Sequence, residues 1–140
     1  MDKILLTAPC GIDCFNCPLL VTNITDDVRS NTAKYLNMPP EDVECKGCRP
    51  EKGQCKGNPN CATWVCVQAK GHTFCHECND FPCEKLSPSF KGAQFPHNLK
   101  VYNNCRIKLV GLDAWIKEAD DIRKRYFNGN FIPGKGPVIK

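Results

Sequence analysis

The sequence predicts a small, mainly α-helical and irregular domain, built from short helices and knuckle loops and ending in a C-terminal helical hairpin. Eleven of the 12 cysteines among its 140 residues fall between Cys10 and Cys83 in tight sets. An apolar stripe repeats at helical spacing in the last third of the chain, formed by Trp115, Ala119, Ile122 and Tyr126. Hydrophobic residues make up 41% of the chain, cysteines included, so the aliphatic core of the first 90 residues is thin.

The clustered cysteines supply what this thin core lacks. Two cysteines separated by two residues can bend back so that both sulfurs meet one cation about 2.3 Å away, and four such thiolates close a tetrahedral zinc site. The sequence therefore predicts a zinc-stabilised domain with two or three zinc ions. The sets are Cys10, Cys14 and Cys17; Cys45 and Cys48; Cys55, Cys61 and Cys66; and Cys75, Cys78 and Cys83.

Disulfides, iron–sulfur clusters and redox-active thiols are the alternatives to zinc. The first nine residues hold only the short apolar run Ile4-Leu5-Leu6, well below the roughly 7 to 15 apolar residues of a signal peptide. No apolar stretch approaches the roughly 18 residues of a membrane span. We therefore expect a cytoplasmic protein without a membrane partner, in which paired cysteines serve as metal ligands or catalytic thiols. An iron–sulfur protein and a thiol redox or metal-handling protein remain open.

The net charge of +4 is unevenly divided along the chain. Residues 1–90 carry 9 Lys and Arg against 11 Asp and Glu, whereas residues 91–140 carry 10 against 4. Two four-thiolate zinc sites, each a −2 centre, would bring the whole chain to about zero. The basic run at residues 123–125 follows Asp120 and Asp121, which predicts ion pairs at i, i+4 on a solvated helix face. We therefore expect no nucleic-acid partner, and a protein partner of unknown identity.

Capping residues and turn formers place the helices. Thr25 precedes an acidic first turn and predicts a helix to about Leu36, before Pro39-Pro40. A short helix is expected at residues 62–70, closed by Gly71, and Pro82 is a candidate first helical residue just before Cys83. The helical hairpin is expected from Pro96 to Val110 and, with Asp113 as its cap, beyond Gly111. These elements predict one domain at residues 1–127 and an extended or mobile tail at 128–140.

Several cysteines have specific expected roles. Cys45-Lys-Gly-Cys48 and Cys75-His-Glu-Cys78 have zinc-knuckle spacing, and Gly47 supplies the unusual dihedrals of the tight return. One plausible partition joins these two knuckles around one metal and draws a second site from the remaining sets, although many partitions fit. The C-x3-C-x2-C spacing at residues 10–17 equals that of radical enzymes, but the chain lacks the strand–helix alternation of their barrel. Cys105 is expected to be a packed core residue.

His72 and His76 each offer a nitrogen ligand, because eleven clustered cysteines do not divide evenly by four. We expect each instead to be a solvated surface histidine. The chain shows no strong acid–base pair and no nucleophile–base motif, so no reaction is predicted and an enzymatic role stays undecided. The leading hypothesis is a zinc-binding, cysteine-rich interaction module whose metal is mainly structural.

Four ordered cysteine motifs resemble those of a family of uncharacterised bacterial and archaeal proteins, domain of unknown function 3795. The motifs are CGIDCFNCP at 10–18, CKGC at 45–48, CATWVCVQAKG at 61–71 and FCHECNDFPCEKL at 74–86. The similarity extends through Gly111–Trp115. The resemblance implies a zinc-binding protein and supplies no reaction. Its metal pattern falls on Cys10, Cys14, Cys17, Cys45, Cys48, Cys61, Cys66, Cys75, Cys78 and Cys83. Cys55, six positions before Cys61, falls outside that pattern.

Overall fold

The computed structural model describes residues 1–56, 58–87 and 98–139. Within these ranges the chain is mainly helical, with four α-helices and one short two-stranded sheet. The helices are α1 (Asp26–Leu36), α2 (Ala62–Lys70), α3 (Asn98–Val110) and α4 (Leu112–Asn128), and the strands are β1 (Asn130–Ile132) and β2 (Gly136–Val138). Single 3-10 turns lie at η1 (Cys14–Asn16), η2 (Pro40–Asp42) and η3 (Cys75–Glu77). None of the described helices is long and apolar enough to cross a membrane.

The predicted ends of the first two helices are confirmed. The Thr25 hydroxyl accepts a hydrogen bond from the Val28 N–H (3.3 Å), and the helix ends at Leu36 with Asn37 in the left-handed conformation. Gly71 closes α2 at φ 68°. A left-handed residue at this position lets its N–H satisfy carbonyls of the last helical turn, which is why glycine or asparagine ends these helices.

The helix starts expected at Asp113 and Pro82 are not observed, whereas the C-terminal helical pair is. Asp113 is not the cap of α4, because the helix begins at Leu112 after Gly111. Asp113 lies in the first turn, where its negative charge interacts favourably with the helix dipole. Pro82 opens no helix, because the chain from Cys83 to Ser87 makes a single turn closed by the Ser87 N–H on the Cys83 carbonyl (2.8 Å). Pro96 lies outside the described residues. The C-terminal helical pair is present, with α3 and α4 in contact on either side of Gly111.

The main hydrophobic core is built by the C-terminal helices and two aromatic rings from the cysteine-rich half. Trp115 is fully buried and meets the Phe15 ring edge-on, with 6.0 Å between ring centroids. Its indole N–H donates to the Asn103 side-chain oxygen (3.2 Å). The predicted stripe holds at three of its four positions, whereas Tyr126 is 38% exposed. The core comprises Phe15, Phe74, Leu99, Ile107, Trp115, Ala119 and Ile122.

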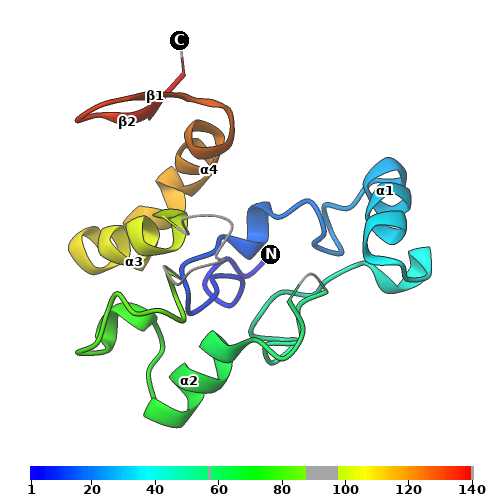
Figure 1. The fold of residues 1–140 in the computed structure, drawn as a ribbon, viewed down its shortest axis with the longest axis horizontal. Helices are drawn as coiled ribbons and strands as arrows, with labels where there is room; N and C mark the ends of the chain where they lie inside the picture. Colours follow the sequence, from blue (N-terminus) through cyan, green and yellow to red (C-terminus); the bar gives the residue numbers. More distant parts are fainter. Residues whose placement is uncertain (57, 88–97, 140) are drawn as a thin grey trace.

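The amino-terminal segment 7–15 runs through the middle of the molecule, between the α3–α4 pair and α2 (Figure 1). The Asn103 amide donates to the Gly11 carbonyl (2.7 Å), and Arg123 on α4 pairs with the buried Asp13 carboxylate (2.6 Å). Gly11 has φ +93°, and a Cβ there would lie 2.9 Å from the Asn104 side chain. Only glycine permits this close approach and this backbone conformation together.

Cys105 and the tail differ from expectation. Cys105 is exposed rather than packed, because it lies two positions from Asn103 and so on the opposite side of α3 from the core face. The tail is not a lone arm: β1 and β2 form an antiparallel hairpin in which Phe131 faces Pro137. An extended or mobile arm was expected there, and its folding into a hairpin was not.

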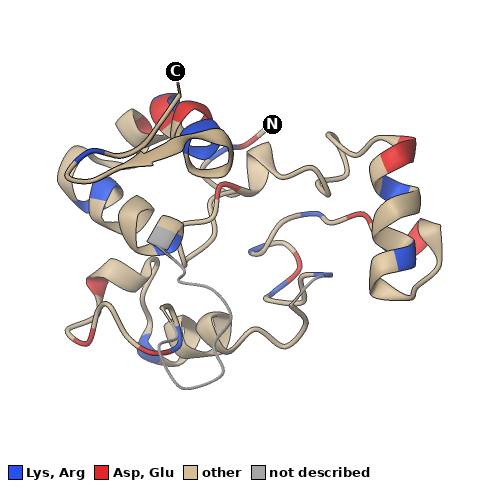
Figure 2. Ribbon diagram, turned by 45° about the horizontal axis from the view of Figure 1, so that its top comes forward, with Lys and Arg blue, Asp and Glu red and all other residues tan. Residues whose placement is uncertain are grey.

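Charged residues of both signs are interspersed along α1 and α4 (Figure 2). The predicted i, i+4 pairs are present, Lys124 with Asp120 at 2.7 Å and Arg125 with Asp121 at 2.9 Å. Arg123, the third member of the basic run, turns inward to Asp13. The run at 123–125 is therefore neutralised within the described chain, through the predicted pairs on the solvated face for Lys124 and Arg125 and through a buried carboxylate for Arg123.

We predict that Trp115→Phe lowers the free energy of unfolding by about 3 kcal/mol, because it shrinks the core side chain and leaves the buried Asn103 oxygen without its donor. Urea unfolding followed by circular dichroism measures the change. Leu109→Ala, at a residue 76% exposed on the neighbouring helix, is the control and should change stability by less than about 0.5 kcal/mol. Equal effects of the two substitutions would contradict the described core.

Candidate metal centre

Four cysteines from three separate segments gather beside the amino-terminal segment and are called here the first thiol group. Cys14 and Cys48 are buried in one small cluster, and Cys55 packs against it. The Cys48 N–H bonds the Cys14 sulfur, and the Cys55 side chain is in hydrogen-bond contact with those of Cys45 and Cys48. The first thiol group is Cys14, Cys45, Cys48 and Cys55.

Local backbone geometry brings this group together. Cys45 pairs with the segment after Cys17, since its N–H donates to the Leu19 carbonyl and its carbonyl accepts from the Val21 N–H (both 2.8 Å). Gly47, at φ +104°, aims its N–H at the Cys45 sulfur (3.3 Å). The predicted role of Gly47 in the knuckle is therefore confirmed.

Burial and mutual contact keep the Cys14, Cys45 and Cys55 thiols protonated in the absence of a cation. Burial raises the pKa of Cys14 from the usual 9.0 to about 12. The pKa of Cys45 is raised further, first by its hydrogen bond with Cys55 and then by burial. For Cys55 the bond with Cys45 lowers the pKa, but the bond with Cys48 and burial outweigh it and bring the value to about 12. A bound cation reverses this balance, because metal binding stabilises thiolates.

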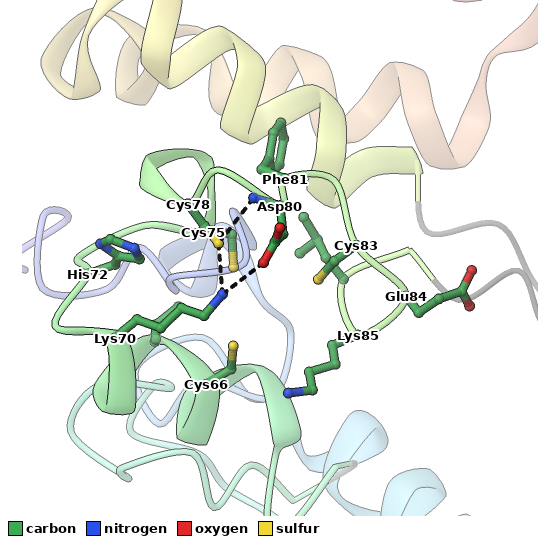
Figure 3. A pocket seen from close by; sticks show the side chains of 12 residues that line it. Cys66, Lys70, His72, Cys75, Cys78, Asp80, Phe81, Cys83, Glu84 and Lys85 are labelled. Atoms are coloured by element: carbon green, nitrogen blue, oxygen red, sulfur yellow. Dashed lines mark hydrogen bonds and ion pairs between the residues drawn. The ribbon is translucent and has the colours of Figure 1, made fainter.

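A second thiol group, formed by Cys66, Cys75, Cys78 and Cys83, surrounds a cavity of about 250 Å³. Cys66 comes from α2, Cys75 and Cys78 from the turn η3 and its end, and Cys83 from the following loop. Figure 3 shows the four sulfurs pointing into the same space from different sides. The Cys75 N–H donates to the Pro9 carbonyl (3.0 Å), which ties this group to the amino-terminal segment.

A lysine ammonium already lies among these sulfurs. Lys70 Nζ is 3.0 Å from the Cys78 sulfur and 3.4 Å from an Asp80 carboxylate oxygen (Figure 3). The Asp80 N–H also donates to that sulfur (3.4 Å). Burial raises the pKa of Cys75 to about 12. The hydrogen bond from Lys70, followed by that from the Asp80 N–H, lowers the pKa of Cys78. Lys70 therefore stabilises the Cys78 thiolate.

The other predicted ligands lie between or beside the two groups. Cys10 is half-buried and packs against the cluster that contains Cys14 and Cys48. Burial raises its pKa, and it interacts electrostatically with Cys61 and Cys75. Cys10 thus lies between the groups, and Cys61 lies near Cys10 and Cys55. Cys17 follows η1 and interacts with Cys14.

The two histidines differ from each other. His72 lines the cavity of the second thiol group. His76 is not a solvated surface side chain: its ring stacks on Phe74 with 5.7 Å between centroids, its backbone N–H donates to Asn104 (3.0 Å), and burial lowers its pKa. His76 is therefore held by packing, whereas the half-buried His72 lies at the edge of the cavity.

Two features of this arrangement differ from the sequence-based partition. The knuckle at 45–48 meets Cys55, whereas the knuckle at 75–78 meets Cys66 and Cys83, so the two knuckles do not share one site. Cys55 was left outside the expected metal pattern because its spacing from Cys61 is irregular. The turn-rich segment between Cys48 and Cys55 was the available signal, since its hydrogen bonds, such as Gly53 N–H to the Cys48 carbonyl (3.0 Å), fold the chain back over the knuckle.

The donor set suits a thiophilic metal, since each group offers four thiols and zinc or iron–sulfur clusters are commonly held by four cysteines. The side chains do not adopt a closed coordination geometry: among the described residues, no three His, Cys, Asp or Glu side chains are placed so that they could hold one ion. The fit therefore rests on donor chemistry and on the gathering of thiols, and metal binding requires the sulfurs to move closer together or to span a larger group.

The fold and the site define a cysteine-rich, mainly helical domain. Residues 6–88, more than half of the chain, match the family described as protein of unknown function (DUF3795), and the chain belongs to this family. The matched region contains both thiol groups and ends before α3. No curated protein and no solved structure matches the chain.

We predict that the reduced, metal-free protein loses stability as the pH rises above about 9. A thiol whose pKa is higher in the folded than in the unfolded chain contributes stability below its unfolded value, near 9.0, and loses it toward its folded value, about 12 for Cys14 and Cys75. Urea unfolding with chelator and reductant, at about pH 8 and about pH 10, measures the loss.

Two variants separate these thiols from other groups that titrate in the same range. Cys105→Ala, at an exposed cysteine outside both groups, should keep the full pH dependence, whereas Cys14→Ala should weaken it. A pH dependence that is the same in both variants would show that the buried thiols are not its source.

Proposed function

We propose that this protein is a thiolate metal-binding domain in which the first thiol group holds a structural zinc ion, and which presents its carboxyl-terminal face to a protein partner. The observation that carries this proposal is the meeting of Cys14, the 45–48 knuckle and Cys55 from segments far apart in the sequence. A four-thiolate zinc site closed in this way has no open position for a substrate, so its role is structural.

Zinc would supply the stability that apolar burial does not. Apart from Phe15 and Phe74, the main core comes from α3 and α4, while the first thiol group adjoins a smaller cluster around Ala8, with Leu6, Ile12 and Trp64 packed against it. Because no three of these thiols converge without metal, zinc binding would draw them together and its binding free energy would add to the free energy of unfolding.

The carboxyl-terminal face supports an interaction role. A groove of about 440 Å³ lies between α3, α4 and the β hairpin, lined by Leu99, Tyr102, Ile122 and Tyr126 and edged by Lys135. Phe131 beside it is 74% exposed. Exposed aromatic side chains next to a cation suit a protein partner with an apolar segment flanked by acidic residues.

Zinc titration of the anaerobically reduced full chain against a chromophoric chelator tests the proposal. We expect one tightly bound zinc that depends on the first thiol group, a rise in the urea midpoint when zinc is added, and proton release on binding. Cys48→Ala should lose this ion, because it removes a ligand. Cys105→Ala, which removes an exposed thiol outside both groups, should retain it.

One outcome of the zinc titration would contradict the proposal. Less than one zinc per chain, with all thiols freely titratable in the native state, contradicts the proposal.

The thiol redox alternative has a specific observation in its favour, the contact between Cys45 and Cys55. It would replace the zinc proposal if mild peroxide produced a Cys45–Cys55 disulfide, seen as a reversible mass loss of about 2 Da, in protein that binds no zinc.

A further inference from the structure

We propose that the second thiol group, Cys66, Cys75, Cys78 and Cys83, holds an iron–sulfur cluster rather than a single zinc ion. This inference rests on the proposed function in taking the gathered thiols as metal ligands. It differs in assigning a polynuclear cofactor to one group and a mononuclear ion to the other.

The first argument is the space between the sulfurs. Four thiolates around one zinc ion, each about 2.3 Å from it, lie about 3.8 Å apart and leave no cavity. The second thiol group instead lines a cavity of about 250 Å³. In a cluster of several irons bridged by sulfides, the four cysteine ligands do not all bind the same iron. Their sulfurs therefore surround a larger space than the four sulfurs around one zinc ion.

The second argument is the contrast with the first thiol group. There, the Cys55 side chain is in hydrogen-bond contact with both Cys45 and Cys48, so these thiols already touch one another. In the second group the sulfurs point inward from separate walls, with Cys66 on α2 facing the η3 cysteines across the space (Figure 3). The same protein therefore offers a tight set of thiols and an open one.

The third argument is the lining of the cavity. Lys70 and the Asp80 N–H both donate to the Cys78 sulfur (3.0 and 3.4 Å), and the cavity lining carries the cations Lys70 and Lys85 beside the acids Asp80 and Glu84. Apolar walls come from Val67, Phe81 and Leu86. A cluster with four thiolate ligands is anionic, and N–H···S bonds, nearby cations and an apolar shell are the features by which proteins hold such clusters and set their potentials.

Anaerobic reconstitution of the full chain with ferrous iron and sulfide, followed by desalting, tests the inference. We expect iron and acid-labile sulfide in equal amounts, about two or about four of each per chain, with visible absorption bleached by dithionite. Cys83→Ala should lose most of this iron and sulfide. Cys48→Ala, in the first thiol group, should keep them while losing the zinc, which shows that the two groups bind independently.

Two results overturn the inference, and they are distinguishable. Two zinc ions per chain, one lost with each group and neither displaced by iron and sulfide, would refute the cluster and leave the proposed function intact. Neither zinc nor iron bound above background would refute both.

A second variant tests the site without removing a ligand. Lys70→Gln deletes the ammonium that donates to the Cys78 sulfur, so the reduction potential of the cluster should fall, since the more negative reduced state loses a cation and a hydrogen bond. Lys124→Gln removes the same charge on α4, where Lys124 pairs with Asp120, and should leave the potential unchanged. An identical potential in both variants, or no reducible chromophore in either, would place any cluster elsewhere and contradict the proposal.

Discussion

The docking of segment 7–15 is the constraint on which the rest of the structure depends. On one side it meets the helical pair, through Asn103 on the Gly11 carbonyl and Arg123 on Asp13. On the other side it meets the cysteine-rich loops, where Arg49 donates to the Thr7 carbonyl (2.7 Å). Because Cys10 and Cys14 lie within this segment, the contacts that join the two halves of the molecule also position two of its thiols.

The two halves of the molecule are stabilised in different ways because their side chains differ. The helical half has a packed core around Trp115 and buried polar contacts, so apolar burial and hydrogen bonds stabilise it directly. The cysteine-rich half has few aliphatic residues to bury and relies on turns that bring thiols together. In our account metal supplies the missing free energy there, and the two thiol groups differ because one is crowded and the other surrounds a cavity.

Much of the fold could be predicted from local chemistry, and the partition of the thiols could not. Thr25 and Gly71 mark helix ends because their cap interactions are short-range, and the 115–122 stripe faces the core because helical period fixes it. Spacing identified Cys45 with Cys48 and Cys75 with Cys78, but which knuckle meets which distant cysteine depends on how the intervening turns fold. Cys105 was misplaced because a single cysteine carries no periodic pattern to show which side of α3 it occupies.

The grouping of the cysteines is the central claim, and alkylation of the zinc-loaded chain followed by peptide mass spectrometry tests it most directly. With one equivalent of zinc, the account predicts that Cys14, Cys45, Cys48 and Cys55 become protected together while Cys105 is modified at an unchanged rate. Protection of Cys45 and Cys48 together with Cys75 and Cys78, with Cys55 left reactive, would contradict it.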